Sequence, residues 1–431
     1  MNPALEKRIK RQIIGKPHRF LAVVSLGFED TLVQELHAIG IETIDDISAN
    51  SDGKVEWTSK ITEAWKAIAY SRIANRILMH IADFKAENFR ELEKKASEVP
   101  WELYLAEASM QHASIHVSCK HSRLYHSDAV AERLQKILEG GCLPLAPNAT
   151  NLFVTLIDDR CTIWLDLAGE ELYKRGHERF VNEAPLKETI AAAMLFEALK
   201  VADSPQVNLF DPMAGSGTFS LEAAYAANRL IPGTCRDFAL KHQPAFKEAT
   251  WKFIVSGKDK ADGKSGLQHA ISKIITSDIS ERAVEIIKHN VECSPLAGIV
   301  PNGSTPAIQP QLRDFFSYTA QDIADACQGD TAPAIVLNPP YGKRLDFDAP
   351  KLYTQIGKKL AELSRELKNF NKALTVAILA PKDDSRPGAQ YTCTANLLQE
   401  CPGLSPENNP AAKLIVTSHG GLTLNTFIAK I

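Results

Sequence analysis

Long apolar segments are missing from this sequence of 431 residues. No run approaches the roughly 20 apolar residues that a membrane-spanning helix requires. Basic residues stand near the start, but no apolar stretch follows them, so the pattern of a secretory signal peptide is missing as well. Both absences predict a cytoplasmic protein without membrane attachment.

Metal-binding cysteine motifs are also lacking. We find no CxxC pair and no histidine companion at ligand spacing among the eight cysteines. These are Cys119, Cys142, Cys161, Cys235, Cys293, Cys327, Cys393 and Cys401. We therefore predict reduced thiols and no metal site.

Strong net charge is lacking too. The formal net charge is −3, with 45% hydrophobic and 23% charged residues, which excludes a disordered chain and a surface that is basic throughout. Basic residues do concentrate in residues 1–19. This basic N-terminal arm either contacts phosphates or is a solvated tail. The length suggests two or three domains.

Two small α+β domains are predicted ahead of residue 173. Residues 20–75 have a β-α-β-β-α order, with strands at Phe20–Val24, Ile41–Ile47 and Lys54–Trp57, that suits a ferredoxin-like domain. Residues 76–172 repeat an α+β pattern and contain a predicted hairpin around Asp158-Asp159.

A loop at residues 120–127 brings cations and an aromatic together within the second of these domains. Lys120 and Arg123 are therefore candidate RNA-binding residues. The alternative is a merely solvated loop.

Residues 187–431 follow a different pattern, after a linker at residues 173–186. Helices alternate with nearly continuous apolar strands, which is typical of a doubly wound parallel sheet, as in Rossmann-like folds. A closing hairpin, Lys413–Thr417 with Thr423–Ile428, predicts an antiparallel strand in this sheet. Residues 230–270 interrupt the alternation and are predicted to be an insertion.

A glycine-containing loop, Asp211-Pro-Met-Ala-Gly-Ser-Gly-Thr218, follows the first strand of this sheet. Glycines there let the backbone approach a ligand closely, and the next helix offers free N–H groups. A dinucleotide-binding loop would have a third glycine at the position of Ser220, which argues against an oxidoreductase. An acidic residue opening the loop suits the ammonium group of an amino-acid cofactor better than it suits pyrophosphate.

Two further aspartates, Asp278 and Asp314, close the second and third strands of the same sheet. The carboxyl ends of parallel strands meet at one edge, so both side chains are expected in the same crevice. One could accept hydrogen bonds from ribose hydroxyls and the other from an adenine amino group. Either could instead cap the element that follows it.

Asn338-Pro339-Pro340-Tyr341 is the most specific motif in the chain. An exocyclic amine on a base is a poor nucleophile, and hydrogen bonds to the Asn338 carboxamide and the Pro339 carbonyl would free its lone pair. Proline has no N–H that would occupy this carbonyl. Tyr341 offers a flat face for an extruded base. The alternative, a turn that ends a strand, is weakened by the glycine loop upstream.

In these motifs the chain resembles the THUMP-containing RNA methyltransferases, in particular the bacterial 23S rRNA guanine-N2 methyltransferases. The segments that carry the resemblance are Leu165–Gly169, Lys174–His177, Ala184–Glu188, Asp211–Phe219, Ser277–Ser280 and Asn338–Leu345. The chain departs from the family at Ala214, where cysteine is frequent, and at His177, where an aromatic is common. The longest members have a second methyltransferase domain that this sequence lacks, so one modification per enzyme is expected.

The resemblance implies a ferredoxin-like domain, an RNA-capturing THUMP domain at 76–172 and an S-adenosylmethionine-dependent catalytic domain. It assigns the methionine part of the cofactor to Asp211, Gly215 and Gly217, the ribose to Asp278, the adenine to Asp314, and the target amine to Asn338–Tyr341. Met213 and Thr218 of the same loop are further candidate cofactor-binding residues. The expected reaction methylates guanine N2 in 23S rRNA. Methylation of a tRNA guanine or of adenine N6 remains open, as does a non-catalytic RNA-binding assembly factor.

Overall fold

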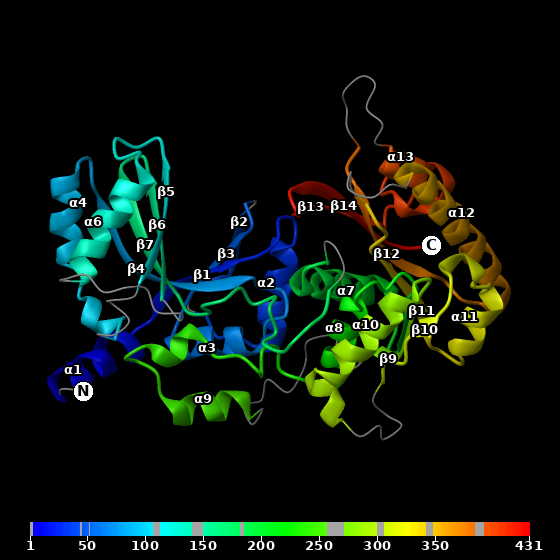
Figure 1. Cartoon of the computed structure of the whole chain (residues 1–431), viewed down its shortest axis with the longest axis horizontal. Helices are drawn as coiled ribbons and strands as arrows, with labels where there is room; N and C mark the ends of the chain where they lie inside the picture. The colour runs from blue at the N-terminus through cyan, green and yellow to red at the C-terminus, as the bar shows by residue number, and fades with distance from the viewer. Residues whose placement is uncertain are drawn as a thin grey trace. The chain divides into compact units, whose positions relative to one another are not determined.

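The computed structural model of the chain forms two compact units (Figure 1). It describes residues 3–43, 45–50, 52–106, 113–139, 150–181, 185–256, 271–299, 306–341, 348–383 and 392–431. Unit 1 comprises Met1–Val24, Ile39–Arg175 and Cys235–Asp262, and unit 2 comprises Ser25–Ala38, Gly176–Thr234 and Gly263–Ile431. Among the described residues, no helix has both the length and the apolar composition needed to cross a membrane.

Unit 1 is built on one seven-stranded sheet, in the order β2-β3-β1-β4-β7-β6-β5. Its strands are β1 (His18–Val23), β2 (Ser48–Asn50), β3 (Lys54–Ser59), β4 (Arg76–Lys85), β5 (Ser114–Lys120), β6 (Asn151–Ile157) and β7 (Arg160–Asp166). Only β5 and β6 pair in parallel. β4 hydrogen-bonds to β1 on one edge and to β7 on the other, so the strands predicted for two separate domains share a single sheet.

The helices of unit 1 are α1 (Pro3–Ile9), α3 (Ile61–Tyr70), α4 (Phe89–Ser97), α6 (Ser127–Glu139) and α9 (Glu248–Val255), with short helices η1 (Lys10–Ile14), η2 (Trp101–Leu103) and η3 (Ala239–His242). The basic arm is therefore helical, with Ile9 and Ile13 buried, so the alternative of a solvated tail is wrong and contact with phosphates stays a prediction. Burial of two isoleucines stabilises a docked helix by a few kcal/mol, roughly 1.5–3 kcal/mol for each.

Two details of the predicted strands can be compared directly. The strand expected at Ile41–Ile47 is absent from the described part of that segment, and the short β2 follows it at Ser48–Asn50. The predicted hairpin is confirmed: β6 and β7 pair around Asp158 and Asp159, which have φ values of 50° and 62°. Aspartate tolerates this left-handed conformation better than most residues do, and it suits a two-residue hairpin turn.

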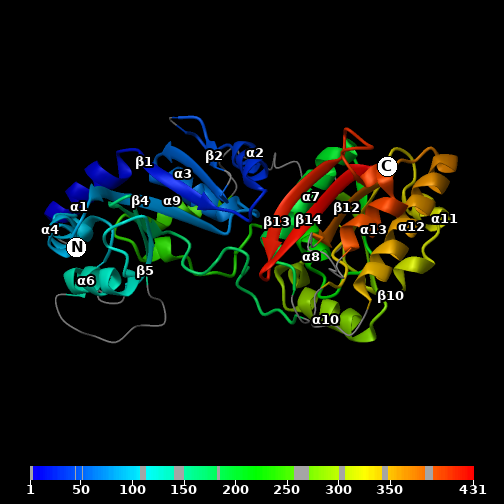
Figure 2. The same ribbon diagram turned by 90° about the horizontal axis from the view of Figure 1, so that it is seen from above.

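The predicted insertion at residues 230–270 interrupts the sequence of unit 2. From Cys235 its described residues belong to unit 1 instead. In Figures 1 and 2, α9 lies beside α3, and the two helices are in contact. The Phe246 ring packs 5.6 Å from that of Trp65, and the Tyr70 hydroxyl donates to the Ile254 carbonyl at 2.6 Å. Residues 257–270 of the insertion lie outside the described residues.

Unit 2 contains the doubly wound sheet, and its parallel core is confirmed. The order is β10-β9-β8-β11-β12-β14-β13, parallel from β10 to β12, with β14 antiparallel to both β12 and β13. The strands are β8 (Val207–Asp211), β9 (Ile271–Asp278), β10 (Gln311–Leu312), β11 (Ala332–Leu337), β12 (Thr375–Pro381), β13 (Lys413–His419) and β14 (Leu422–Lys430). Because β8, β9, β10 and β11 are parallel neighbours, the segments that follow them meet at one edge.

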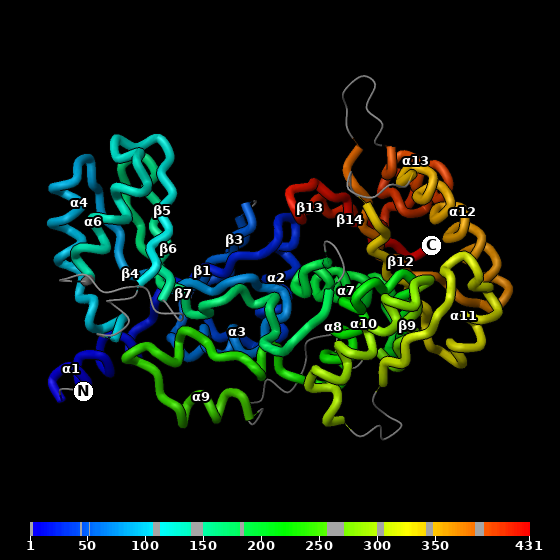
Figure 3. The backbone as a smooth tube through the Cα atoms, in the orientation of Figure 1, coloured from blue at the N-terminus to red at the C-terminus, as the bar shows by residue number. Residues whose placement is uncertain are grey.

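Helices cover both faces of this sheet, as the backbone trace in Figure 3 also shows. They are α2 (Glu29–Ile39), α7 (Glu188–Ala202), α8 (Thr218–Ala227), α10 (Glu281–Glu292), α11 (Ala320–Ala326), α12 (Ala349–Leu367) and α13 (Cys393–Glu400), with short helices η4 (Pro295–Gly298), η5 (Phe315–Ser317), η6 (Lys368–Phe370) and η7 (Pro402–Leu404). One buried cluster joins α11, α12 and α13 to β11, β12 and β14. On the other face, α7 contacts α8 and β14.

Helix α2 precedes the ferredoxin-like strands β2 and β3 in sequence, yet it belongs to unit 2. The Thr31 hydroxyl donates to the Glu197 carboxylate of α7 at 2.8 Å, and Lys200 donates to Gln34 at 2.6 Å. Residues 235–256 do the reverse: they lie between segments of unit 2 in sequence but belong to unit 1. Neither compact unit is therefore one continuous stretch of chain.

Candidate active site

The loop after β8 closes over the end of β9. The Gly215 amide donates to Oδ2 of Asp278 at 2.9 Å. Gly215 and Gly217 have φ values of 57° and 79°, a left-handed backbone that favours glycine. A Cβ on Gly215 would meet nothing within 4 Å, whereas a Cβ on Gly217 would lie 3.1 Å from the Ile287 side chain. Gly215 therefore borders open space, and Gly217 lets the loop pack against α10.

Asp278, the last residue of β9, holds this loop through its carboxylate. Oδ2 accepts from Gly215, and Oδ1 accepts from the Ser280 amide at 2.9 Å. The N-cap of α10 is Ser280, so Asp278 does not cap that helix but anchors its own turn and the glycine loop. Each carboxylate oxygen can accept a second hydrogen bond, so both retain capacity for a ligand hydroxyl.

Asp211 is the most deeply buried acid at this edge, with 1% of its surface exposed. One carboxylate oxygen accepts from the Ser220 hydroxyl at 2.7 Å and from the Ser220 amide at 3.2 Å. Burial raises the pKa of Asp211 to about 7, against the lowering effect of Ser220, and the nearby Asp278 charge raises it further. A cation placed between these two acids would relieve their repulsion.

The other predicted cofactor residues differ in their surroundings. Asp314 is half-buried beyond β10 and accepts from the Phe316 amide at 3.0 Å, so it caps η5. Met213 packs against the hydrophobic core. The Thr218 hydroxyl accepts a hydrogen bond from Arg179. Met213 and Thr218 follow β8, and Asp314 follows β10, which is separated from β8 by β9 in the same parallel sheet. Their contacts with a cofactor stay predictions.

The Asn-Pro-Pro-Tyr motif begins directly after β11. Asn338 Oδ1 is buried, and no group among the described residues donates a hydrogen bond to it. Pro339 is buried and Pro340 is exposed. Burial raises the pKa of the Tyr341 phenol above its usual range, so this side chain is neutral. Since β11 pairs in parallel with β8, the motif stands at the same edge as Asp211.

Two family models match the chain. Residues 175–377 match the model described as the RMKL-like methyltransferase domain, and residues 19–78 match the RlmL ferredoxin-like domain. The chain carries an RMKL-like methyltransferase domain. Neither model reaches residues 79–174, so the THUMP assignment stays a prediction.

Curated relatives carry corresponding names. The chain is 30% identical to the ribosomal RNA large subunit methyltransferase K/L of Shewanella baltica over 79% of its own length and 46% of the relative's. It is 28% identical to the protein of the same name from Allochromatium vinosum, over 80% of this chain and 46% of that protein. The chain thus spans about half the length of these relatives. It is 28% identical to YpsC of Bacillus subtilis, which bears an RNA methyltransferase name, over 81% of this chain and 86% of that protein.

Solved structures share the fold. A possible methylase from Clostridium difficile 630 has a TM-score of 0.71 at 23% identity, covering 96% of this chain and 98% of that one. TrmN from Thermus thermophilus has a TM-score of 0.60 at 17% identity, covering 96% of this chain and all of that one. At these identities the likeness establishes a common fold.

Two residues next to the methyltransferase domain's glycine loop were not predicted from the sequence. Arg179 donates to the hydroxyls of Ser216 (3.1 Å) and Thr218 and pairs with Glu188. Asn290, fully buried on α10, donates to the Ser216 carbonyl at 3.0 Å. Both residues tie the segment after residue 175 to the loop. A lone arginine or asparagine carries no local pattern, so only the three-dimensional packing could reveal them.

A second omission concerns α10 of the methyltransferase domain. The statement that no cysteine has a histidine at ligand spacing is wrong, because His289 and Cys293 stand four residues apart at the end of this helix. Their side chains approach to 3.5 Å, and Glu178 lies near both. The spacing of one helical turn was the available signal.

The two predicted RNA-binding residues of unit 1 have different surroundings. Arg123 forms ion pairs with Glu87 and Asp159, so its charge is largely compensated. Lys120 is exposed, and within the described residues it forms no ion pair. Tyr125, with 68% of its surface exposed, stands in the same loop. Lys120 and Tyr125 are therefore the more accessible groups.

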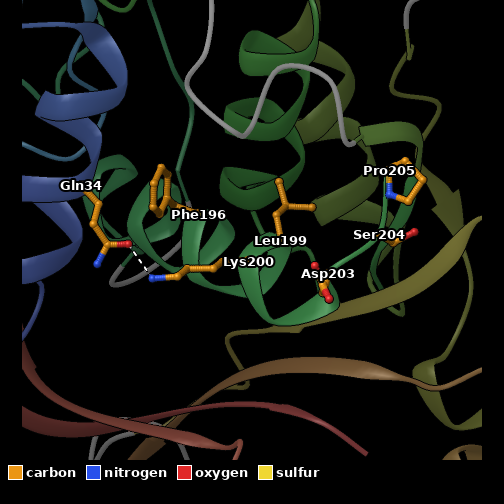
Figure 4. Close-up of a pocket in the computed structure, with 7 residues that line it drawn as sticks. All are labelled: Gln34, Phe196, Leu199, Lys200, Asp203, Ser204 and Pro205. Carbon is orange, nitrogen blue, oxygen red and sulfur yellow. Dashed lines mark hydrogen bonds between the residues drawn. The ribbon is translucent and has the colours of Figure 1, made fainter.

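A cavity of about 440 Å³ in unit 2 is drawn in Figure 4. It is lined by Gln34, Phe196, Leu199, Lys200, Asp203, Ser204 and Pro205. Residues 203–205 precede β8, whereas the glycine loop follows it, so the cavity lies at the opposite end of that strand. It contains none of the predicted site residues. The candidate site at the carboxyl ends of the strands is therefore separate from this cavity.

Residues 184 and 342–345 contribute to the motifs of the resemblance but lie outside the described residues.

Proposed function

We propose that this protein transfers a methyl group from S-adenosylmethionine to the exocyclic N2 amine of a guanine in RNA, with 23S rRNA as the favoured substrate. One observation carries the chemistry: Asn338 Oδ1 is a buried acceptor without a donor among the described residues. An unsatisfied buried acceptor costs about 1–3 kcal/mol, and a hydrogen bond from a substrate amine would remove that cost.

The residues at the sheet edge fit the proposed cofactor. Asp211 and Asp278 are two neighbouring acids, of which Asp211 has a raised pKa, and the ammonium group of a methionine moiety would neutralise the repulsion between them. The open space beside Gly215 admits a ligand close to the backbone. Asp278 and Asp314 would accept from ribose hydroxyls and the adenine amine. When bound, the cofactor supplies an electrophilic methyl group on a sulfonium.

The chain's own residues would orient and activate the target amine. Asn338 Oδ1 and the Pro339 carbonyl would each accept a hydrogen bond from one N–H group of the target amine. These hydrogen bonds would localise the lone pair on the nitrogen. Tyr341 stacks on the base, contributing about 1–3 kcal/mol. As the new N–C bond forms, the C–S bond breaks, and the nitrogen then loses a proton to water. Positioning of the amine in line with the methyl group supplies much of the acceleration.

The names of the curated relatives support ribosomal RNA as the substrate. We further propose that residues 76–172 act as a THUMP domain and that the protein works in the cytoplasm, where ribosomal RNA is modified. A tRNA guanine or adenine N6 would use the same Asn338 chemistry. A non-catalytic assembly factor would have no use for the Asn338 acceptor.

The test is methylation by the purified chain with radiolabelled S-adenosylmethionine and separate samples of unmodified 23S rRNA, tRNA and DNA, followed by digestion to nucleosides. We expect label in N2-methylguanosine from 23S rRNA. Label only in tRNA or in N6-methyladenosine would preserve the chemistry and overturn the substrate. Cofactor binding without any transfer would favour the assembly factor.

Cofactor affinity is expected to rise with pH up to about 7. Burial raises the pKa of Asp211 to about 7, so below that pH the carboxyl is protonated and must ionise to hold an ammonium group. The affinity should fall by up to about tenfold per pH unit below 7 and level off above it. Calorimetric titration between about pH 5.5 and 8 measures this. The stability of the unliganded protein changes with pH in the opposite direction. Because the pKa of Asp211 is raised in the folded state, the free energy of unfolding falls as the pH rises through 7.

Asp211→Asn provides the control for that profile. Its affinity should be weaker and nearly independent of pH over the same interval. A wild-type profile that persists in Asp211→Asn would assign the titration to another group.

Lys120→Ala is expected to weaken RNA binding by about threefold to tenfold and to lower the slope of log affinity against log salt by about 1. Arg123→Ala should have a smaller effect, because Glu87 and Asp159 already compensate its charge. Filter binding at several salt concentrations checks both. Lys252→Ala, an exposed lysine of unit 1, is the matched control, and an equal loss in all three variants would remove the specific role of this loop.

A further inference from the structure

Three metal-ligating side chains meet at the end of α10, outside the proposed active site. His289 and Cys293 come from the helix and its C-cap, and Glu178 comes from the segment that leads into unit 2. One ligand atom from each, a ring nitrogen, Sγ and a carboxylate oxygen, lies within 4.8 Å of the other two. No other such group of three occurs among the described residues, and nothing in the proposed methyl transfer uses this one.

The backbone around Glu178 is held in place by its neighbours. The Asn290 carboxamide accepts from the Phe180 amide at 2.7 Å and donates to the Phe180 carbonyl at 2.9 Å. Arg179 is fixed by Glu188 and by two hydroxyls of the glycine loop. Glu178 therefore directly precedes two residues, Arg179 and Phe180, that are each held by several hydrogen bonds. A ligand presented by an anchored backbone loses less conformational entropy on binding than one from a free loop.

The His289 ring is fixed as well. The Phe180 ring stacks on it, with centroids 3.9 Å apart and an interplanar angle of 18°. Stacking covers a face of the imidazole and leaves the in-plane lone pair of its nitrogen free to bind. Cys293 Sγ lies 3.5 Å from His289 Nε2. This arrangement orients the two side chains toward a common point.

We propose that Glu178, His289 and Cys293 bind one Zn²⁺ ion, with water as the fourth ligand. Thiolate, imidazole and carboxylate together suit zinc, whereas Mg²⁺ and Ca²⁺ take oxygen ligands. Zn–N and Zn–S bonds of roughly 2.1 and 2.3 Å at a tetrahedral angle place nitrogen and sulfur about 3.6 Å apart. The Nε2–Sγ distance of 3.5 Å agrees with this without rearrangement.

Zinc at this position would join the segment at residues 176–181 to α10. Asn290 already connects α10 to Ser216 of the glycine loop, so the ion would stiffen the frame on which that loop rests. Binding requires the Cys293 thiolate, and the thiol proton passes to solvent. Affinity should therefore decline as the pH is lowered.

The test is zinc binding to the full chain after metal removal, by competition with a chromophoric chelator, and Co²⁺ substitution followed by absorption spectroscopy. We expect one Zn²⁺ per chain and a thiolate-to-Co²⁺ charge-transfer band. Cys293→Ser and His289→Gln should each weaken zinc binding at least about tenfold, because loss of even an outer-shell partner has that effect. Glu178→Gln should weaken it less and retain the charge-transfer band.

Cys235→Ser supplies the matched control, since Cys235 is an exposed free thiol elsewhere in the chain. It should bind zinc as the wild type does. Circular dichroism of each variant establishes that it is folded before its zinc affinity is compared. Zinc binding that survives Cys293→Ser and His289→Gln in folded protein, or the absence of stoichiometric binding in the wild type, would overturn the proposal and leave a thiol–imidazole contact within one helix.

Discussion

Asn338→Ala is expected to lower the rate of methyl transfer by about 10²–10³-fold while changing affinity for S-adenosylmethionine by less than about twofold. Removal of one oriented hydrogen-bond partner from a reacting group has costs of this size in other enzymes. The Asn338 oxygen has no donor among the described residues, so its removal leaves no protein group unpaired. Single-turnover kinetics with saturating RNA measures the rate, and calorimetry measures the affinity.

Asn408→Ala is the matched control for this substitution. Asn408 is an exposed asparagine of unit 2. The next residue, Asn409, donates to the Lys430 carbonyl, and Lys430 pairs with Thr375 at the start of β12, so Asn408 lies toward the edge opposite the carboxyl ends of the parallel strands. Its replacement should leave the rate unchanged. Wild-type turnover by folded Asn338→Ala would refute the proposed activation of the amine. A loss of cofactor affinity equal to the loss of rate would instead assign Asn338 to cofactor binding.

Asp278→Asn is expected to weaken S-adenosylmethionine binding by about 1.5–3 kcal/mol, which is roughly 10- to 100-fold. The asparagine preserves the shape of the side chain, but one carboxylate oxygen becomes an NH₂ group. That group cannot accept from Gly215 or from a ribose hydroxyl, so both the loop and the ligand lose a partner. Calorimetric titration with S-adenosylmethionine measures the change.

Asp325→Asn is the comparison for Asp278→Asn, because Asp325 is exposed on α11, where it accepts a hydrogen bond from the Gln321 side chain at 2.8 Å. It should bind cofactor normally. Ligand-induced thermal stabilisation gives a second reading, since a weaker ligand raises the melting temperature less at equal concentration. Unchanged binding by Asp278→Asn would remove the ribose role from this residue.

The parallel sheet of unit 2 could be predicted because each of its strands and the loop after it show their character within a few consecutive residues. Strands such as β11 and β12 are continuous apolar runs, and the loops after them contain glycine, proline and acidic residues. Parallel order then requires that their carboxyl ends share an edge, which brings Asp211, Asp278 and Asn338 to one side. The strand order confirms that these three residues follow strands ending at one edge of the sheet, and their roles stay predictions.

The remaining features depend on contacts between distant segments. The pairing of Arg123 with Glu87 joins residues 36 positions apart, and nothing local indicates it. The packing of α9 on α3 joins residues separated by 184 positions at the Tyr70–Ile254 contact. The strand expected at Ile41–Ile47 had suitable residues but found no partner strand, and β-structure requires one. The spacing of four residues between His289 and Cys293, in contrast, is a local feature of the sequence.

The exchange of segments between the two units bears on the order in which the chain can fold as it is synthesised. Unit 1 needs residues 235–256 to cover Trp65 and α3, so its packing cannot be completed until the first two segments of unit 2, Ser25–Ala38 and Gly176–Thr234, have left the ribosome. Helix α2, made early, must wait for α7 before Thr31 can reach Glu197. Neither unit can therefore be obtained intact by cutting the chain once between residues 175 and 187, and separate expression of either would need the missing segment supplied in trans or grafted by circular permutation.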